Sequence, residues 1–210
     1  MKKLILATNN RHKIAEIREI LEGLDVDIYS AADFEDFPEI VETGATLEQN
    51  AILKARSVWN KYRLPCLADD TGLEVAWLDG APGVYSARFD GPGCTYDDNN
   101  RKLLGLLEGV GIEKRAAVFK TVIAFVDENG AACAVEGTLE GHIGFEPRGK
   151  HGFGYDPVFV VGDRTLAEMT PEEKNSISHR SLALRKIRPI ILKAFSNADS
   201  SGVESSDPTH

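Results

Sequence analysis

Two adjacent carboxylates, Asp69 and Asp70, stand inside an apolar stretch of strand type at Cys66–Ala76. A hydroxyl and a glycine, Thr71 and Gly72, follow them. Because Asp is depleted from strand interiors, we expect the pair where a buried strand reaches an open edge of its sheet, which is where ligands bind in α/β proteins. The same residues also form good turns. Taken alone, the stretch predicts a structural turn as readily as a site.

A polar loop near the start of the chain has the composition of a phosphate-binding loop. It spans Thr8–Lys13, between an apolar run at Leu4–Ala7 and a helical pattern that ends before Gly23. Arg11, Lys13 and the free N–H groups at the start of that helix would lie together, which suits a phosphate. The loop lacks the glycines of a Walker loop or a dinucleotide fingerprint. A plain strand-to-helix connection is therefore the alternative.

A third candidate is the loop Pro147–Pro157, whose closely spaced glycines let the backbone approach a ligand. Phe153 and Tyr155 stand beside these glycines and offer ring faces for a nucleobase. A long surface loop is the alternative, but a structural loop has little reason to hold aromatic residues between glycines. The segment predicts a binding loop.

The last helical pattern opens with Ser178, His179 and Arg180 and continues as an apolar stripe that ends at Phe195. Cations in the first turn of a helix oppose its dipole. An anionic or carbonyl-bearing ligand near His179 and Arg180 would remove this conflict.

The elements that must position these residues alternate between strands and helices. Strand patterns cover residues 4–7, 25–30, 66–76, 116–127, 132–139 and 158–161. Helical patterns cover residues 14–22, 46–63, 95–108 and 178–195. A hairpin turn at Asp127–Gly130 joins two of the strands. A hairpin that follows strand–helix units predicts an α/β protein with a mixed sheet.

The helix over residues 46–63 brings further polar side chains. It opens with a capping box formed by Thr46 and Gln49. Asn50 and Lys54 are four residues apart and share a face of the helix, which points either into a site or into water. An acidic loop, Ala31–Gly44, precedes this helix.

The composition, with 42% hydrophobic and 27% charged residues in a chain of 210, is that of a globular protein. A net charge of -9 opposes nucleic-acid binding, whereas local cationic clusters such as Arg148–His151 fit a small anionic ligand. The three cysteines have neither disulfide nor zinc spacing. No segment has the length of a signal peptide's apolar core or of a membrane span. We therefore expect a cytoplasmic protein with no membrane or nucleic-acid partner.

Six motifs, in order between Leu4 and Phe195, resemble those of the inosine/xanthosine triphosphate pyrophosphatases. They are Thr8-Asn9-Asn10 with Lys13; Glu42-Thr43-Gly44 with Asn50-Ala51 and Lys54-Ala55; Ala68-Asp69-Asp70-Thr71-Gly72-Leu73; Gly80-Ala81-Pro82-Gly83 with Tyr85-Ser86-Ala87-Arg88; Phe153-Gly154-Tyr155-Asp156-Pro157; and Ser178-His179-Arg180.

The resemblance implies a Mg²⁺-dependent enzyme that hydrolyses ITP, dITP and XTP to the monophosphate and pyrophosphate. It also implies a homodimer whose subunits fold as an elongated mixed α/β sheet flanked by helices, in two lobes with the active-site cleft between them. The family pattern covers residues 1–195 as a single two-lobed domain. The polar composition of residues 196–210 predicts a disordered tail.

The resemblance also implies a role for individual residues. Asp70 would accept the proton from the attacking water and bind the metal, with Asp69 and Glu42 as further metal ligands. The triphosphate would be bound by Thr8, Asn9, Asn10, Arg11, His12, Lys13, Lys54 and Thr71. The base and sugar would be bound by Phe153, Gly154, Tyr155, Asp156, Lys174, His179 and Arg180.

One departure from the family pattern concerns the metal. Many relatives carry two adjacent acids before the Thr-Gly of the second motif, whereas here Val41 precedes Glu42. The outer metal ligand is then missing, replaced by Glu42, or supplied by Glu39.

Two other functions are alternatives to a pyrophosphatase. A metal-dependent phosphatase of the haloacid dehalogenase type needs Asp-x-Asp, and Asp69 and Asp70 lack that spacing. A purine nucleotide-binding module without catalysis would place bare carboxylates against a triphosphate, which is repulsive unless a metal lies between them.

Overall fold

The computed structural model describes residues 2–200 of the chain, with side chains to residue 196. Within this part the strands form one mixed sheet in the order β2-β1-β3-β5-β6-β7-β8, with β4 beside β3. The strands are β1 Lys2–Leu6, β2 Val26–Tyr29, β3 Cys66–Val75, β4 Pro82–Gly83, β5 Ala116–Val126, β6 Ala132–Ile143, β7 Phe159–Val161 and β8 Arg164–Thr165. The helices are α1 Arg11–Ile20, α2 Leu47–Tyr62, α3 Tyr96–Leu106, α4 Pro171–Ile177 and α5 His179–Ser200.

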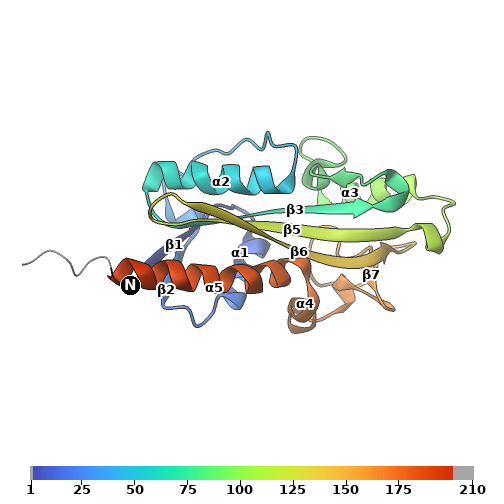
Figure 1. Ribbon diagram of the computed structural model, residues 1–210. Helices are drawn as coiled ribbons and strands as arrows, with labels where there is room; N and C mark the ends of the chain where they lie inside the picture. Colours follow the sequence, from blue (N-terminus) through green and yellow to red (C-terminus); the bar gives the residue numbers. More distant parts are fainter. Residues whose placement is uncertain (1, 201–210) are drawn as a thin grey trace, which may run out of the picture.

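The sheet combines parallel and antiparallel pairs, as predicted. Strand β1 runs parallel to both β2 and β3, while β3, β5, β6, β7 and β8 pair antiparallel in turn. The long strands β3, β5 and β6 run lengthwise through the molecule (Figure 1). The predicted α/β class, with a central mixed sheet flanked by helices, is confirmed.

Helices cover both faces of the sheet. Helix α2 lies on one face and α5 on the other (Figure 1). Helix α2 buries Leu47, Ala51, Ala55 and Val58 in one core cluster. The predicted stripe of α5 is buried in a second cluster, which also contains Ile17 of α1. Each helix is amphipathic because its apolar residues recur on one face.

Strand β3 corrects the expectation that Asp69 and Asp70 end a strand or form a turn. The strand continues through both acids to Val75, and β5 pairs with it along its whole length. Strand β1, however, pairs only with Cys66 and Leu67. Because β5 satisfies the backbone hydrogen bonds of this segment, tertiary pairing overrides the weak strand propensity of Asp. The open edge of the sheet therefore lies alongside β3, where β1 no longer pairs with it, and not at the end of a strand.

Threonine residues cap the starts of three helices, and the cap of α2 differs in part from the prediction. Thr46 caps α2 by accepting from the backbone N–H of Gln49. The Gln49 side chain accepts from the N–H of Ala45 and not from that of Thr46, so only half of the predicted capping box forms. Thr95 and Thr170 start α3 and α4 with complete capping boxes.

The chain end also differs from expectation. Helix α5 continues to Ser200, past Phe195, after which the sequence predicted a disordered tail. The rest of that predicted tail, 201–210, lies outside the described residues. Among residues 2–200, no helix combines the length and apolar character needed to cross a bilayer.

Candidate active site

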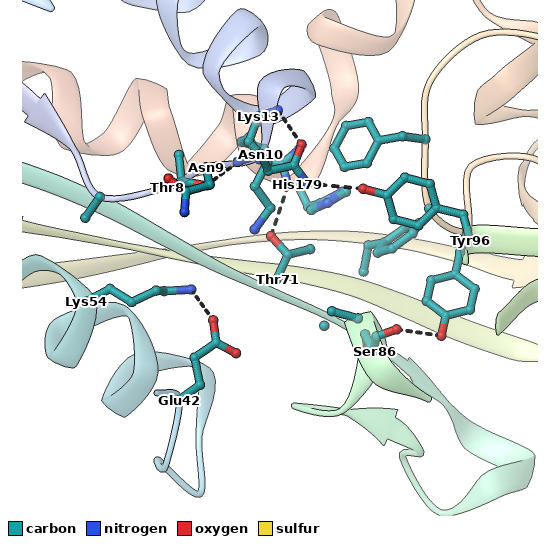
Figure 2. A pocket seen from close by; sticks show the side chains of 18 of the residues that line it. Thr8, Asn9, Asn10, Lys13, Glu42, Lys54, Thr71, Ser86, Tyr96 and His179 are labelled. Atoms are coloured by element: carbon teal, nitrogen blue, oxygen red, sulfur yellow. Dashed lines mark hydrogen bonds and ion pairs between the residues drawn. The ribbon is translucent and has the colours of Figure 1, made fainter. Parts of the chain in front are cut away.

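A cavity of about 390 Å³ opens where β1 stops short along β3. Its volume is within the range of small-molecule sites. Most of the predicted substrate and metal residues line it, namely Thr8, Asn9, Asn10, Lys13, Glu42, Lys54, Thr71, Phe153, Gly154, Tyr155, Asp156, Lys174, His179 and Arg180. Figure 2 shows Lys54 and Glu42 on one side of this pocket, with Lys13 and His179 across from them.

Asp69 and Asp70 are not among the residues that line the cavity. They precede the lining residue Thr71 on β3 and lie on opposite faces of the sheet, because successive side chains of a strand alternate. Asp70 faces α2 and Asp69 faces α1 and α5. The strand therefore separates two carboxylates that the sequence brought together, and each has its own cations.

Asp70 and Glu42 share one ammonium group. Lys54 Nζ lies 2.7 Å from Asp70 Oδ1 and 2.9 Å from Glu42 Oε1. Arg88 Nη1 approaches the other oxygen of Glu42 at 3.4 Å. Burial raises the pKa of Asp70 above its ordinary value, although Lys54 opposes the shift. A carboxyl with a raised pKa is a better proton acceptor than an ordinary one.

Asp69 is the centre of a second charge cluster. Its Oδ2 lies 2.9 Å from Lys13 Nζ and 3.3 Å from Arg180 Nε, and it accepts from the Thr71 hydroxyl at 3.3 Å. Burial opposes the ionisation of Asp69, but the charges of Lys13 and Arg180 outweigh it and hold the pKa of Asp69 well below its ordinary value. Asp69 is therefore ionised and holds the two cations in place.

Glu16 of α1 extends this cluster and was missed in the sequence. Its two carboxylate oxygens accept from Lys174 Nζ, at 2.9 Å, and from Arg180 Nη1. Lys174 also donates to Asp156 Oδ2 at 2.6 Å. The signal was available, because Glu16 lies three residues after Lys13 and therefore on the same side of α1.

The carboxylates of Asp69 and Glu16 also correct the expectation about the first turn of α5. The sequence predicted that a ligand would neutralise the cations there. Arg180 instead bonds two acids of the protein itself, together with the hydroxyl of Thr71 at 3.1 Å.

His179 is a neutral donor or acceptor in the wall of the cavity. Its ring stacks on Phe119, with centroids 4.5 Å apart. Burial and the nearby charges of Arg180 and Lys174 lower its pKa well below the ordinary value. Within the described residues, its buried Nδ1 has no hydrogen-bond partner. The residue lines the cavity, while the unpaired Nδ1 itself is buried.

The two aromatic residues of the glycine-rich loop differ in their surroundings. Phe153 lies in the cavity wall, where His12 stacks on it at 5.0 Å and Lys174 Nζ lies 4.9 Å from its ring centroid. Tyr155 is buried, and its hydroxyl donates to the backbone oxygen of Ser86 at 2.9 Å. Phe153 therefore has the place expected of a base-stacking ring, and Tyr155 joins two loops.

At the predicted phosphate loop, the side chain of Asn10 caps α1. Its Oδ1 accepts from the backbone N–H groups of His12 and Lys13, at 3.0 and 3.3 Å. These two N–H groups are therefore not free for a phosphate, contrary to expectation. Arg11 and His12 are exposed and do not line the cavity, whereas Thr8 and Asn9 do.

Several lining residues had no sequence signal of their own. They include Phe37, Pro38 and Ile40 of the acidic loop, Tyr96 and Asn99 of α3, and Phe119 of β5. Tyr96 accepts from Asn10 Nδ2 at 3.2 Å, which joins α3 to the start of α1 across the cavity (Figure 2).

The residues that could hold a metal are few. Across residues 2–200, no group of three or more His, Cys, Asp or Glu side chains is arranged to hold a metal ion. Asp70 and Glu42 nevertheless converge on one cation, the ammonium of Lys54. Mg²⁺ at nucleotide sites needs only one or two carboxylates, because substrate phosphates and waters complete its shell. The donor set of Asp70 and Glu42 fits that requirement.

A sequence profile of the Ham1 family matches residues 4–190. The chain belongs to the Ham1 family. A dITP/XTP pyrophosphatase of Thermoanaerobacter pseudethanolicus is 56% identical over 193 residues, covering 91% of this chain and 97% of the relative. A dITP/XTP pyrophosphatase of Porphyromonas gingivalis is 52% identical over 196 residues, covering 92% of this chain and 100% of the relative. The family membership predicted from the six motifs is confirmed.

Solved structures agree with the Ham1 assignment. A HAM1 protein from Coxiella burnetii superposes with a TM-score of 0.83 at 43% identity, covering 92% of this chain and 100% of that one. The Ham1 protein of Staphylococcus aureus superposes with a TM-score of 0.82 at 34% identity, covering 91% of this chain and 99% of that one. The mixed α/β architecture is therefore the Ham1 fold.

Proposed function

We propose that this protein hydrolyses the non-standard purine nucleoside triphosphates ITP, dITP and XTP to the monophosphate and pyrophosphate, which removes them from the nucleotide pool. The observation that carries the proposal is the match, over nearly the whole chain, to relatives named dITP/XTP pyrophosphatase. The cavity supports it, because cations and an aromatic ring share its wall.

The triphosphate lies toward Lys13 and Lys54 in this proposal, and the base toward Phe153. Cations beside the attacked α-phosphate offset the negative charge that develops in the transition state. Asp70 accepts the proton of the attacking water, for which its raised pKa is suited. Asp69 keeps Lys13 and Arg180 in position from the other face of the strand.

Mg²⁺ is the proposed cofactor, held by Asp70 and Glu42. When bound, the ion would neutralise phosphate charge and polarise the phosphoryl oxygens. Asp69 was a further ligand candidate, but it faces the opposite side of the sheet and already binds two cations. We therefore assign the metal to the acids that meet at Lys54.

Base selection is assigned first to His179. A site that donates a hydrogen bond to a 6-oxo group leaves that donor unpaired against the 6-amino group of adenine, at a large cost in rate. His179 has an unpaired ring nitrogen among the described residues, whereas the guanidinium of Arg180 already bonds Asp69, Glu16 and Thr71. Replacing His179 with Ala should reduce the preference for ITP over ATP, and an unchanged ratio would place selection elsewhere.

One assay separates the rival functions. ITP, XTP, dITP, GTP and ATP are each supplied with Mg²⁺, and the released phosphate species is identified. Pyrophosphate from the 6-oxo purines supports the proposal. Orthophosphate would indicate a phosphatase, and binding without turnover would indicate a nucleotide-binding module.

Two further proposals concern the protein as a whole, and the family resemblance carries the first of them. We propose a homodimer, for which Tyr85, 60% exposed beside a groove along β3 and β4, is a candidate contact. Light scattering gives the molar mass that checks it.

We also propose a cytoplasmic location, supported by the three free cysteines, because free thiols are typical of reducing compartments.

A further inference from the structure

Asn50 of helix α2 is a buried amide that the proposed mechanism does not use. Its exposed fraction is 0%. The side chain donates from Nδ2 to Asp70 Oδ2 at 3.3 Å and accepts at Oδ1 from the backbone N–H of Gly44 at 2.7 Å. One amide therefore joins the strand that carries Asp70 to the loop that carries Glu42.

Lys54 makes a parallel connection one helical turn later. Residues four apart on a helix share a face, and Lys54 bonds Asp70 and Glu42 as Asn50 bonds Asp70 and Gly44. The two contacts differ in kind. The ammonium neutralises charge and tolerates many directions, whereas an amide offers donors on one side and an acceptor on the other. Asn50 can therefore fix how the carboxylate is turned.

The loop lies close against α2 at this point. A Cβ at Gly44 would lie 2.6 Å from Asn50 Oδ1 and 2.8 Å from Gln49 Cβ, both too close for a real side chain. The backbone can approach the amide of Asn50 because residue 44 is a glycine. Glu42, two residues earlier, is carried into the cavity by this contact.

We infer that Asn50 is a positioning residue that aligns the carboxylate of Asp70 and holds Glu42 beside it. The inference rests on the proposed function, in which these two carboxylates hold the metal and Asp70 accepts a proton. Side chains that orient metal ligands typically contribute 10- to 100-fold to metal affinity or activity. We therefore expect the loss of the Asn50 donor to lower activity by about 10- to 100-fold.

Gln49 supplies a matched control from the next position of the helix. Its Oε1 accepts from the N–H of Ala45 at 2.8 Å, so it bonds the same loop. The side chain is exposed, unlike that of Asn50. Asn50→Asp and Gln49→Glu each convert an amide into a carboxylate and keep the acceptor for the loop. Only Asn50→Asp replaces the donor to Asp70 with a second negative oxygen.

Pyrophosphate release from ITP is then measured for the wild type and both variants. Asn50→Asp should lower kcat by about 10- to 100-fold, leave KM for ITP unchanged and raise the Mg²⁺ concentration needed for half activity. Gln49→Glu should keep the wild-type values. Circular dichroism confirms that each protein is folded. If Asn50→Asp does not fold, Asn50→Ala carries the same comparison.

Hydrogen exchange at the amide of Gly44 gives a readout that needs neither metal nor turnover. The amide should be protected in the wild type and in Asn50→Asp, which keeps the acceptor, and should exchange faster in Asn50→Ala. Equal kcat in Asn50→Asp and Gln49→Glu, or equal Gly44 exchange in Asn50→Ala and the wild type, would overturn the inference. A wild type that releases no pyrophosphate would instead overturn the proposed function, while the exchange result still decides whether Asn50 holds the loop.

Discussion

On strand β3 the side chains of Asp69 and Asp70 leave the backbone in opposite directions, which gives them different surroundings. Asp69 is enclosed by Lys13 and Arg180 and stays ionised. Asp70 shares Lys54 with Glu42 and has a raised pKa. A carboxylate with its own buried counter-ions is suited to holding a structure together, and one with a raised pKa is suited to proton transfer.

Replacing Asp70 with Asn tests whether Asp70 is the proton acceptor. The amide keeps the shape of the side chain and loses the proton acceptor, so kcat for ITP should fall by at least about 100-fold. Single-turnover pyrophosphate release measures the chemical step, and calorimetry with an uncleavable analogue should show nucleotide binding largely intact. Turnover close to that of the wild type would remove Asp70 from the chemistry.

The second metal ligand is tested by comparing Glu42→Gln with Glu39→Gln. Both acids line the cavity, but Glu42 shares the ammonium of Lys54 with Asp70, and Glu39 is exposed in the acidic loop. Only Glu42→Gln should raise the Mg²⁺ concentration that gives half activity. The reverse result would make Glu39 the ligand and leave Glu42 as a partner of Lys54.

At the scale of single residues, the sequence predicted most of the residues of the site but not the contacts between them. Most of the motif residues from Thr8 to Arg180 gather in one cavity, because their loops, strands and helices meet beside the gap in the sheet. The opposite facing of the two Asp residues follows from strand alternation, which applies only once the segment is known to be a strand. Glu16 was missed although its spacing from Lys13 placed it on the same side of α1, because the cations that it binds lie 158 and 164 residues away.

At the scale of elements, the first turn of α5 rests directly on strand β6. A Cβ at Gly137 would lie 2.1 Å from the backbone oxygen of His179 and 2.5 Å from the backbone nitrogen of Ala183. Backbone atoms cannot turn aside as a flexible side chain can. The absence of a side chain at Gly137 therefore sets how closely α5 approaches the sheet, and with it the depth at which His179 and Arg180 enter the cavity.

Gly137→Ala should push the start of α5 outward. We expect a loss of about 1–3 kcal/mol in the free energy of unfolding, as for other overpacked sites, together with a reduced ratio of ITP to ATP turnover. Urea unfolding measures the first effect and pyrophosphate release the second.

Gly105→Ala in helix α3 is the matched control, because nothing lies within 4 Å of the added Cβ. In an exposed helical position the same substitution should stabilise by about 0.4–1 kcal/mol. Equal effects at positions 105 and 137 would show that close packing at Gly137 does not position α5.

The course of the elements was largely predictable, because hydrophobic period and capping residues are local signals. The starts of α2, α3 and α4 all follow a Thr cap. Strand β3 was less predictable, since its passage through two acids depends on β5, about 50 residues away in the chain. The end of α5 was also missed, because the polar composition after Phe195 does not show that the helix continues.

At the scale of the whole molecule, buried ionisable groups make stability depend on pH. The pKa of His179 in the folded protein lies well below its ordinary value. As the pH falls, this side chain is therefore protonated in the unfolded chain before it is protonated in the folded protein. The stability from this group is present above a pH of about 6.5 and is lost as the pH falls, by up to about 1.4 kcal/mol per pH unit. The pKa of Asp69 is also lowered in the folded protein, so protonation of this group adds a further loss of stability below about pH 4.

His179→Phe checks this expectation, because the new ring can keep the stacking on Phe119. Urea unfolding between pH 7.5 and pH 5 should show a shallower loss of stability in this variant than in the wild type. Identical slopes would mean that His179 takes up its proton equally in both states.

The ion pairs of the cavity also bear on how the protein is made. Glu16 and Arg180 are 164 residues apart, yet they bond to one another within the cluster around Asp69. Because domains emerge from the ribosome with the N-terminal end first, Lys13, Glu16 and Asp69 are synthesised long before their last counter-ion. A nascent chain cut off before residue 180 would have to bury two acids without that guanidinium. Premature termination near the end of the message should therefore yield a chain with no working cavity, so that activity depends on completed translation.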